Sequence, residues 1–395
     1  MRSALSFFCR DASRAAAFVF CLAMLVSCQP LSGAQQVAPM SSPATSSPWE
    51  MQNSTTKASL RGIHAMGGGV AWASGTDGTV LRTEDGGYMW QSCAMPPGAE
   101  KLDFRGIWAW DANIAMVMSS GPGDQSRLYK TTDGCSSWKL LYTNPDKDGF
   151  WDAIFFTSVW TGLILGDPVN GSFVLLQTSD GGTTWKPTRS DPTLNAAYQG
   201  EGAYAASNSS LVIAEESAYK YKWSLHPSFV GETSFVGVGG KGGSRVMSCV
   251  VHRNSEGRRI DPWRSTKIPL ASGTDSSGVF SLAFRDQDHG MAVGGDYKKP
   301  NESQGTAAWT GDGGKTWTAA IRPPNGYRST VAWDEADNAW IAAGTNGSDV
   351  SFDDGKTWQY LDSGKWNALS LPWVVGPEGR IAKLVSLKSA GISGK

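Results

Sequence analysis

Three arginines hold the same position in three repeated segments, just where each segment begins an apolar stretch. They are Arg61 in Leu60-Arg61-Gly62, Arg105 in Phe104-Arg105-Gly106 and Arg328 in Tyr327-Arg328-Ser329. Asp152 and Asn367 occupy this position in two further segments, and we predict that these five residues form a binding surface. A guanidinium binds a carboxylate through two parallel hydrogen bonds, so arginines converging on one rim could hold an acidic group. The alternative is structural, since each arginine could pair with Asp103, Asp152 or Glu201 and tie neighbouring segments together.

Four acidic residues could instead serve a hydrolase, namely Asp152, Glu201, Asp167 and Asp296. Glycosidases use two carboxyl groups at a set separation, one as the acid and the other as nucleophile or base. Asp167 and Asp296 each follow a glycine at the end of an apolar stretch. An aspartate there commonly accepts a hydrogen bond from the backbone of its own turn. From the sequence, both interpretations of these two residues remain open.

Other chemistries lack their sequence signals. The four histidines (His64, His226, His252 and His289) do not have metal-ligand spacing, and there is no Gly-x-Ser-x-Gly, Walker or dinucleotide-binding motif. We therefore predict neither a metal nor a cofactor. The 35 basic and 36 acidic residues give a net charge of -1, which argues against a nucleic acid or an anionic membrane surface as the partner.

One phrase, Ser/Thr-x-Asp-x-Gly-x-x-Trp, recurs five times along the chain. In each copy the Asp can bond the backbone of a turn, the glycine can adopt a positive φ, and the Trp is large enough to anchor the outgoing strand. In the second copy, Gly134 is followed by Cys135 at the fifth position of the phrase, where the other four copies have a glycine. We predict that the five aspartates are structural rather than catalytic: Asp85, Asp133, Asp180, Asp312 and Asp353.

The phrase resembles the Asp-box, or BNR, repeat of sialidases and other β-propellers. That resemblance implies an all-β propeller. A sialidase also needs an arginine triad, a tyrosine nucleophile with its glutamate, and usually an Arg-Ile-Pro or Arg-Leu-Pro stretch near its start. The last is absent, and spacing reveals no Tyr/Glu pair. A glycoside hydrolase, sialidase-like or of another propeller type, is the alternative function, with a glycan as its possible ligand.

The repeats predict a seven-bladed propeller of four-stranded antiparallel blades over residues 48–386, because two columns of apolar strands each recur seven times. In the fourth repeat, which begins at Tyr204, the box is lost at residues 253–257, and we expect an inserted hairpin near 215–233. The seventh repeat lacks an outer strand. Residues 49–53 are expected to supply that strand and close the ring. Residues 387–395 are expected to be a tail.

The N-terminus has the features of an export signal over residues 1–28. A basic start is followed by an apolar stretch, Ala15 to Val26, that is short for a bilayer span and ends in Leu25-Val26-Ser27-Cys28. This ending resembles the bacterial lipobox, which implies that Cys28 is lipidated and that residues 29–47 are a flexible tether. The alternative is an ordinary secretory signal with a coincidental cysteine.

Three cysteines remain beyond the signal and the anchor: Cys93, Cys135 and Cys249. An exported protein meets an oxidising compartment, where disulfides persist. Cys93 ends the outer strand of the first repeat and Cys135 sits in the box of the second. These two could form a disulfide, and the sequence leaves that pairing open.

As a whole, the sequence resembles the photosystem II stability/assembly factor-like proteins. The likeness rests on Ser59-Leu60-Arg61-Gly62-Ile63, on Phe104-Arg105-Gly106-Ile107, on the successive boxes, and on the closing Gly376-Pro-Glu-Gly379-Arg380-Ile-Ala. It implies an exported, often lipidated scaffold that binds a protein partner without catalysis, with arginines on one face meeting that partner. The expected location is the periplasmic face of the envelope, at the outer membrane in a Gram-negative cell. A photosystem client is not implied, since such proteins also occur in bacteria without photosynthesis.

Overall fold

The computed structural model describes residues 47–188, 197–215, 230–254 and 257–394 of the 395-residue chain. The described residues belong to one compact unit, 45–395. The predicted export signal, Cys28 and nearly all of the predicted tether lie outside the described residues, as do residues 216–229 of the predicted insertion. One short 3-10 helix, η1 (Gly123–Gln125), interrupts an otherwise all-β chain in the described part. No helix long and apolar enough to cross a bilayer occurs among the residues described.

The first half of the chain forms three four-stranded antiparallel sheets, each built from consecutive strands. The first contains β2 (Leu60–Gly67), β3 (Val70–Gly75), β4 (Val80–Thr83) and β5 (Gln91–Ser92). The second contains β6 (Phe104–Ala109), β7 (Ala115–Ser119), β8 (Arg127–Thr131) and β9 (Lys139–Thr143). The third contains β10 (Trp151–Phe156), β11 (Gly162–Val169), β12 (Ser172–Thr178) and β13 (Lys186–Pro187).

A ten-stranded sheet follows, and it combines two ladders. One ladder contains β14 (Glu201–Gly202), β15 (Leu211–Glu215), β16 (Val230–Gly240), β17 (Arg245–Asn254), β18 (Gly257–Ile260) and β19 (Arg264–Lys267). The other contains β20 (Ser277–Phe284), β21 (Gly290–Asp296), β22 (Ala307–Thr310) and β23 (Thr318–Ala319). A single residue pair, Gly239 with Gly278, joins β16 to β20. The two ladders are therefore nearly independent.

Two more four-stranded sheets complete the described chain. One contains β24 (Thr330–Asp334), β25 (Ala339–Gly344), β26 (Gly347–Ser351) and β27 (Gln359–Asp362). The other has the order β1-β30-β29-β28, with β1 (Trp49–Gln52), β28 (Ala368–Ser370), β29 (Trp373–Val375) and β30 (Ile381–Leu384). The first strand of the unit thus pairs with the last, in the register Trp49 to Leu384.

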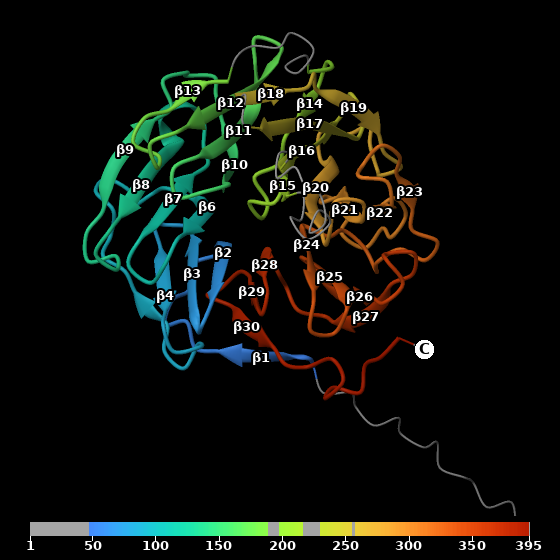
Figure 1. The fold of residues 1–395 in the computed structure, drawn as a ribbon. Coiled ribbons are helices and arrows are strands. Elements are labelled where there is room, and N and C mark those ends of the chain that lie inside the picture. Colours follow the sequence, from blue (N-terminus) through green and yellow to red (C-terminus); the bar gives the residue numbers. More distant parts are fainter. Residues whose placement is uncertain (1–46, 189–196, 216–229, 255–256, 395) are drawn as a thin grey trace, which may run out of the picture. The chain divides into compact units, whose positions relative to one another are not determined.

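The sheets are arranged around a common centre (Figure 1). Strands β2, β6, β10, β15, β20, β24 and β28 lie nearest that centre, and the later strands of each sheet lie farther out. Apolar clusters fill the space between neighbouring sheets. For example, Leu60 and Ile63 of β2 pack with Trp373 and Val375 of β29. This packing sets the inner strands side by side.

Each repeated phrase forms the turn between the third and fourth strands of a sheet, as the sequence predicted. In the third sheet, Asp180 Oδ1 accepts hydrogen bonds from Thr178 Oγ1 (2.8 Å) and from the amides of Thr183 and Thr184 (2.9 Å each). The pattern of a box hydroxyl and later amides bonded to the aspartate recurs in the other four boxes. The box tryptophans are all at most 9% exposed. These contacts account for the five aspartates as turn residues.

The fifth box position faces the preceding sheet. Gly87 has φ 95°, and a Cβ there would lie 2.2 Å from the ring of Trp373 on β29. Only glycine allows that approach. In the second box this position is Cys135, which instead forms a disulfide with Cys93 of the first sheet. The disulfide that the sequence left open is therefore present, and it joins the first two sheets. In the other boxes a glycine packs closely against the preceding sheet at this position.

The fourth repeat differs from its prediction. Tyr204, Ala205 and Ala206 were expected to start an inner strand, but the ladder stops after Gly202 and resumes at Leu211. Residues 203–210 cross to other sheets: Asn208 bonds the backbone of Ile107 and Ile154, and Ser207 bonds the carbonyl of Ser329. The small polar residues of this segment satisfy backbone groups of the inner strands. We call residues 203–210 the central segment.

The predicted C-terminal tail packs against the fold. Leu387 is fully buried and Ala390 is 6% exposed, in or beside the cluster that contains Trp366 and Leu361. The amide of Leu387 donates to Asp337 Oδ2 at 2.9 Å. The apolar side chains of residues 387–390 are thus part of the folded unit rather than a free end.

Candidate functional site

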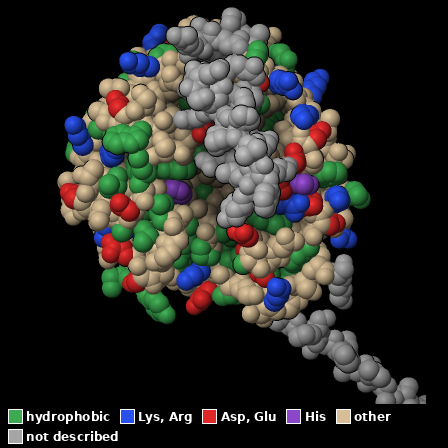
Figure 2. Space-filling view, in the orientation of Figure 1, with side chains coloured by type: hydrophobic (Ala, Val, Ile, Leu, Met, Phe, Trp, Pro, Cys, Tyr) green, Lys and Arg blue, Asp and Glu red, His purple; other side chains and the backbone are tan. Residues whose placement is uncertain are grey.

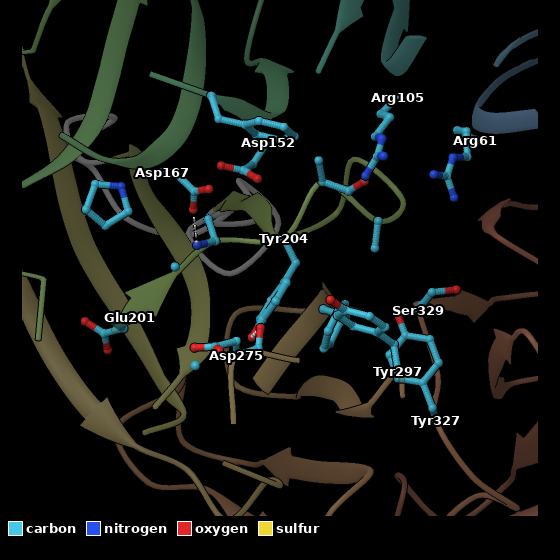
Figure 3. Close-up of a pocket in the computed structure, with 18 of the residues that line it drawn as sticks. Arg61, Arg105, Asp152, Asp167, Glu201, Tyr204, Asp275, Tyr297, Tyr327 and Ser329 are labelled. Atoms are coloured by element: carbon cyan, nitrogen blue, oxygen red, sulfur yellow. Dashed lines mark hydrogen bonds between the residues drawn. The ribbon is translucent and has the colours of Figure 1, made fainter. Parts of the chain in front are cut away.

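A cavity of about 820 Å³ opens where the innermost strands begin (Figure 3). Its position follows from β-bulges. In β2, β6, β10 and β20, the pairing with the next strand shifts by one residue and leaves one extra residue without a partner. These extra residues are Arg61, Arg105, Asp152 and Phe280. A bulge re-aims the side chain of the extra residue. All four of these side chains line the cavity.

The remaining inner strands have an equivalent position. We call this position the slot. Outside the second sheet, the paired strand contains or is followed by a glycine that faces the residue before the slot, as Gly75 faces Leu60. In the second sheet Ser119 pairs with Phe104 instead. The slot is thus the residue that follows. Across the described sheets the slot residues are Arg61, Arg105, Asp152, Gly202, Phe280, Ser329 and Asn367, and all of them line the cavity.

Arg61 and Arg105 lie side by side because they share one carboxylate. Asp103 Oδ2 accepts from Arg105 Nε at 2.8 Å and from Arg61 Nη2 at 3.4 Å. Arg105 Nη1 donates to the carbonyl of Ala205 in the central segment at 3.1 Å. Arg61 Nη1 and Arg105 Nη2 have no such partner among the described residues, and the two side chains are 29% and 27% exposed. Two cations therefore share one counter-charge and keep donors for a ligand.

Arg328 does not belong to this surface, which corrects the sequence prediction. Gly344 faces Arg328 as Gly75 faces Leu60, so Arg328 occupies the core-facing position and Ser329 takes the slot. The Arg328 side chain is fully buried and ion-paired with Asp349 of β26, with Nε donating at 2.7 Å. The sequence alignment was wrong by one residue in this repeat, because an arginine stands where other repeats have a large apolar residue.

Glu201 and Asn367 are also occupied by structural bonds. Glu201 holds the core-facing position of its sheet and accepts two hydrogen bonds of 2.6 Å from Arg245 on β17, with its side chain fully buried. Asn367 lies in its slot at 9% exposure, but its Nδ2 donates to the carbonyl of Leu60 at 2.7 Å. Glu201 is thus paired within its own sheet, with an arginine that the sequence analysis did not name, and the Asn367 amide ties the last sheet to the first.

Asp152 and Asp167 come together on the side of the cavity opposite the arginines (Figure 3). Asp152 is 1% exposed, and its Oδ2 has no hydrogen-bond partner in the described part of the chain. Asp167 is the extra residue of a bulge in β11, and its Oδ1 accepts from the amide of Ala203 at 2.9 Å. This bond crosses to the central segment, so Asp167 is not the turn residue that the alternative proposed.

The two carboxyl groups have raised pKa values. Burial raises the pKa of Asp152 well above its ordinary value; the nearby charge of Asp167 adds to the rise and Arg105 opposes it. Burial raises the pKa of Asp167 to about 6, against the hydrogen bond from Ala203. Burial thus disfavours the ionised form of both carboxyl groups.

Asp296 is separate from this pair. It ends β21, does not line the cavity, and accepts from the amide of Lys298 (3.0 Å) and from Thr274 Oγ1 (3.2 Å). The bond to an amide two residues later is the turn interpretation of the sequence. Asp296 is thus a structural residue, whereas Asp167 is a cavity residue.

Aromatic rings form another part of the cavity wall. Tyr204 stacks on Phe280 with ring centroids 3.9 Å apart, and Tyr327 meets Phe280 edge-on at 4.8 Å. Tyr297, 45% exposed, adds a ring at the rim. In the sequence pattern, Tyr204 and Tyr327 stand at the apolar starts of their repeats. In each repeat the slot directly follows the core-facing residue. Applying this one-residue offset to the sequence could have identified the aromatic residues of the cavity.

The charge at the site is local. Over the visible part of one face, lysine, arginine and acidic side chains are interspersed (Figure 2). No cluster of three or more His, Cys, Asp or Glu side chains suited to a metal occurs in the ranges described. The arrangement can hold a peptide-sized ligand by charge and by aromatic contact.

No protein-family model matches the chain. Among curated proteins, the photosystem II assembly lipoprotein Ycf48 of Synechococcus sp. (strain CC9902) is 23% identical over 291 residues, covering 69% of this chain and 79% of that protein. Among solved structures, YCF48 bound to D1 peptide has a TM-score of 0.54 at 14% identity and covers 86% of this chain and 97% of the other.

Two further structures have the same fold. YCF48 from Cyanidioschyzon merolae has a TM-score of 0.55 at 18% identity, covering 85% of this chain and 98% of the other. The WD40 β-propeller domain of Doa1 has a TM-score of 0.52 at 10% identity, covering 87% and 98%. By sequence the chain is related to Ycf48, a photosystem II assembly factor, and by fold it is an all-β protein similar to β-propellers.

Proposed function

We propose that this protein is a non-catalytic propeller scaffold that binds an acidic group of a protein partner. The binding site is the cavity where the innermost strands begin. The supporting observation is the pair Arg61 and Arg105, which share Asp103 and keep donors directed to solvent. Guanidinium groups held in this way match a carboxylate without further reorganisation. A solved relative in fold, YCF48, is bound to D1 peptide, which agrees with a peptide as the ligand class.

The glycosidase alternative has less support. Of the four candidate carboxylates, Glu201 is ion-paired with Arg245 and Asp296 lies outside the cavity. Only Asp152 and Asp167 remain together, and Asp152 is 1% exposed. Binding without hydrolysis is therefore the function that the cavity fits best.

The fold proposal is a closed ring of seven four-stranded blades. In it, β1 completes the last blade and the joined ten-stranded sheet counts as two. The pairing of β1 with β30 and the single-residue link between β16 and β20 support this count. The blade-one to blade-seven contact is supported by the bond from the Leu60 amide to the Gly376 carbonyl, 3.0 Å.

We also propose that the chain is exported and anchored by a lipid on Cys28, at the periplasmic face of the envelope. The sequence Leu25-Val26-Ser27-Cys28 supports this, and the related Ycf48 is named a lipoprotein. Cells fed a radioactive fatty acid should label the protein. Label that persists in Cys28→Ala would reject the anchor.

Charge reversal at the arginines tests the binding function. Fluorescent octapeptides of Gly and Ser with a free C-terminal carboxylate are compared with their C-terminal amides, by polarisation on the full chain. We expect the carboxylate to bind more tightly, and the difference to vanish in Arg61→Glu and Arg105→Glu. Because such charges are partly exposed, added salt should weaken binding, with screening over roughly 8 Å at physiological ionic strength.

Arg264→Glu is the matched control, since Arg264 is an exposed arginine on the outer strand β19. It should bind like the unmodified protein. Equal binding of carboxylate and amide peptides to the unmodified chain would reject the proposal. Hydrolysis of a glycan panel that is abolished by Asp152→Asn would favour the glycosidase.

A further inference from the structure

The cavity is bipolar, and the proposed function uses only its basic side. Arg61 and Arg105 lie on one side, Asp152 and Asp167 on the other, with Tyr204 between them (Figure 3). The acidic side is built by the fold. Asp152 and Asp167 are the extra residues of bulges on the neighbouring strands β10 and β11. Two adjacent bulges thus bring both carboxyl groups to the same wall.

One buried oxygen on this wall lacks a partner. Asp152 is 1% exposed and its Oδ2 makes no hydrogen bond to any described residue, although the residue lines the cavity. A buried polar atom without a partner costs free energy, about 1–3 kcal/mol, and a donor supplied by a ligand would remove that cost. The second oxygen of Asp167 likewise has no partner in the described ranges, since the Ala203 amide takes Oδ1. The wall therefore offers acceptor oxygens that have no partner in the described ranges.

We propose that Asp152 and Asp167 bind a cationic side chain, guanidinium or ammonium, of the same peptide whose acidic group Arg61 and Arg105 hold. This inference rests on the proposed function, because it assigns the second half of one ligand. The ligand class is then a peptide with a basic residue at a set distance from its acidic group. The tyrosine and phenylalanine rings between the two sides would contact the intervening residues, and the rings also favour a passing cation.

Neighbouring charges do not already fill this role. Arg105 on β6 is held by Asp103 and the Ala205 carbonyl, and Arg245 on β17 is held by Glu201. The remaining charges of the cavity wall are Asp148, beside Lys147, and Asp275, ion-paired with Lys241; both are largely exposed. Tyr204 donates its hydroxyl to the carbonyl of Ser277. A ligand cation would therefore meet the two carboxyl groups directly.

Protonation of the carboxyl groups competes with binding of a cation. Burial raises the pKa of Asp167 to about 6 and raises that of Asp152, so acid favours the neutral forms. A bound cation stabilises the ionised forms and lowers both pKa values. Binding should consequently strengthen as pH rises through about 6, the pKa of Asp167, and release protons to the buffer in that range.

The test places one arginine at successive positions of the Gly/Ser octapeptides with a free C-terminal carboxylate. Each peptide has a twin with citrulline, which keeps the shape and removes the charge. On the unmodified chain we expect the best arginine peptide to bind roughly tenfold or more tightly than its twin, as a charged hydrogen bond provides. Calorimetry in two buffers of different ionisation enthalpy should show proton release for that peptide and not for its citrulline twin.

Variants separate this proposal from the binding function on which it rests. In Asp152→Asn and in Asp167→Asn, the arginine-to-citrulline ratio should fall toward one while the carboxylate-to-amide ratio is kept. In Arg105→Glu the reverse is expected. Asp148→Asn is the control, because Asp148 lines the same cavity at an exposed position and should keep both ratios. Melting curves verify that each variant is folded, and Asp167→Asn serves if the buried Asp152→Asn is not.

Equal binding of arginine and citrulline peptides at every position of the unmodified chain would overturn the cation site. If the carboxylate preference survived in that case, the proposed function would stand without it. Loss of both preferences would reject both. An arginine preference that Asp152→Asn and Asp167→Asn leave unchanged would also overturn the assignment of these residues.

Discussion

At the scale of single residues, a shift of one position decides between core and cavity. Arg105 and Arg328 belong to similar tripeptides, yet Arg105 is the bulged residue that lines the cavity and Arg328 precedes the equivalent slot. Arg328 therefore points into its own sheet, where Asp349 neutralises it. Burial raises the pKa of Asp349 and the Arg328 charge acts against that rise. The pair behaves as a structural tie.

Arg328→Leu should destabilise the fold without altering the peptide specificity of the protein that remains folded. Removing one partner of a buried ion pair leaves the other charge unpaired, at a cost of about 3–5 kcal/mol. Urea unfolding measures the loss. The double variant Arg328→Leu with Asp349→Leu should recover much of it, since the unpaired charge is gone. A stable Arg328→Leu protein that loses its carboxylate preference would contradict this assignment.

At the scale of elements, the repeated turn and the β-bulge have different structural roles. The box turn fixes where the outer strands reverse, whereas the bulge fixes which side chain enters the cavity. The central segment adds a third element, because Asn208 and Ser207 bond strands of different sheets. Its place explains why Ala205 and Ala203 supply backbone groups to both sides of the site.

Asp180→Ala should weaken the turn between β12 and β13. The hydrogen bonds of Thr184 and its neighbours lower the pKa of Asp180 from the usual 3.8 to about 2. This turn therefore adds stability above about pH 4, and that part is lost as pH falls toward 2. We expect a loss of about 1 kcal/mol at pH 7, modest because the group is largely solvated, and little difference from the unmodified protein below pH 2.

Ser179→Ala is the control for this change, because Ser179 is exposed in the same turn. Thermal melting from pH 7 down to pH 2 gives both curves. If Asp180→Ala melted like the unmodified chain at neutral pH, the box aspartate would not be a stabilising turn residue.

At the scale of the whole molecule, the first strand, β1, pairs with the last strand, β30. Trp49 on β1 is 4% exposed, packs 6.0 Å from the ring of Trp366, and donates from Nε1 to Ser348 Oγ at 2.9 Å. Strand β1 also covers the edge of β30, which would otherwise present unpaired backbone groups. The cavity depends on this joint, since Arg61 is on β2, the next strand after β1, and Asn367 bonds the carbonyl of Leu60.

Trp49→Ala should therefore lower the free energy of unfolding by about 3–5 kcal/mol, the range for a buried tryptophan replaced by alanine. Met51→Ala on the same strand should change it little, since Met51 is 55% exposed. Differential scanning calorimetry compares the three proteins. Equal stability of Trp49→Ala and the unmodified chain would mean that β1 does not hold the structure together.

The sequence alone determined what is local and repeated. The five boxes specify their turns because each Asp, Gly and Trp acts within a few residues, and alternating apolar strands specify an all-β chain. Arg61, Arg105 and Asp152 were recognised as one column for the same reason. The fourth and sixth repeats were not aligned correctly, because Glu201 and Arg328 stand at core positions where the other repeats have apolar residues.

Only the tertiary structure decided which charges remain available. Arg245 neutralises Glu201 and Asp349 neutralises Arg328 across strands of the same sheet, and no local spacing encodes those pairs. The approach of Asp167 to Asp152 depends on bulges in β10 and β11. The position of Tyr204 depends on the central segment, which is not part of the strands of its own sheet. Burial and pairing are sums over distant contacts, so the bipolar character of the cavity exists only once the sheets have packed.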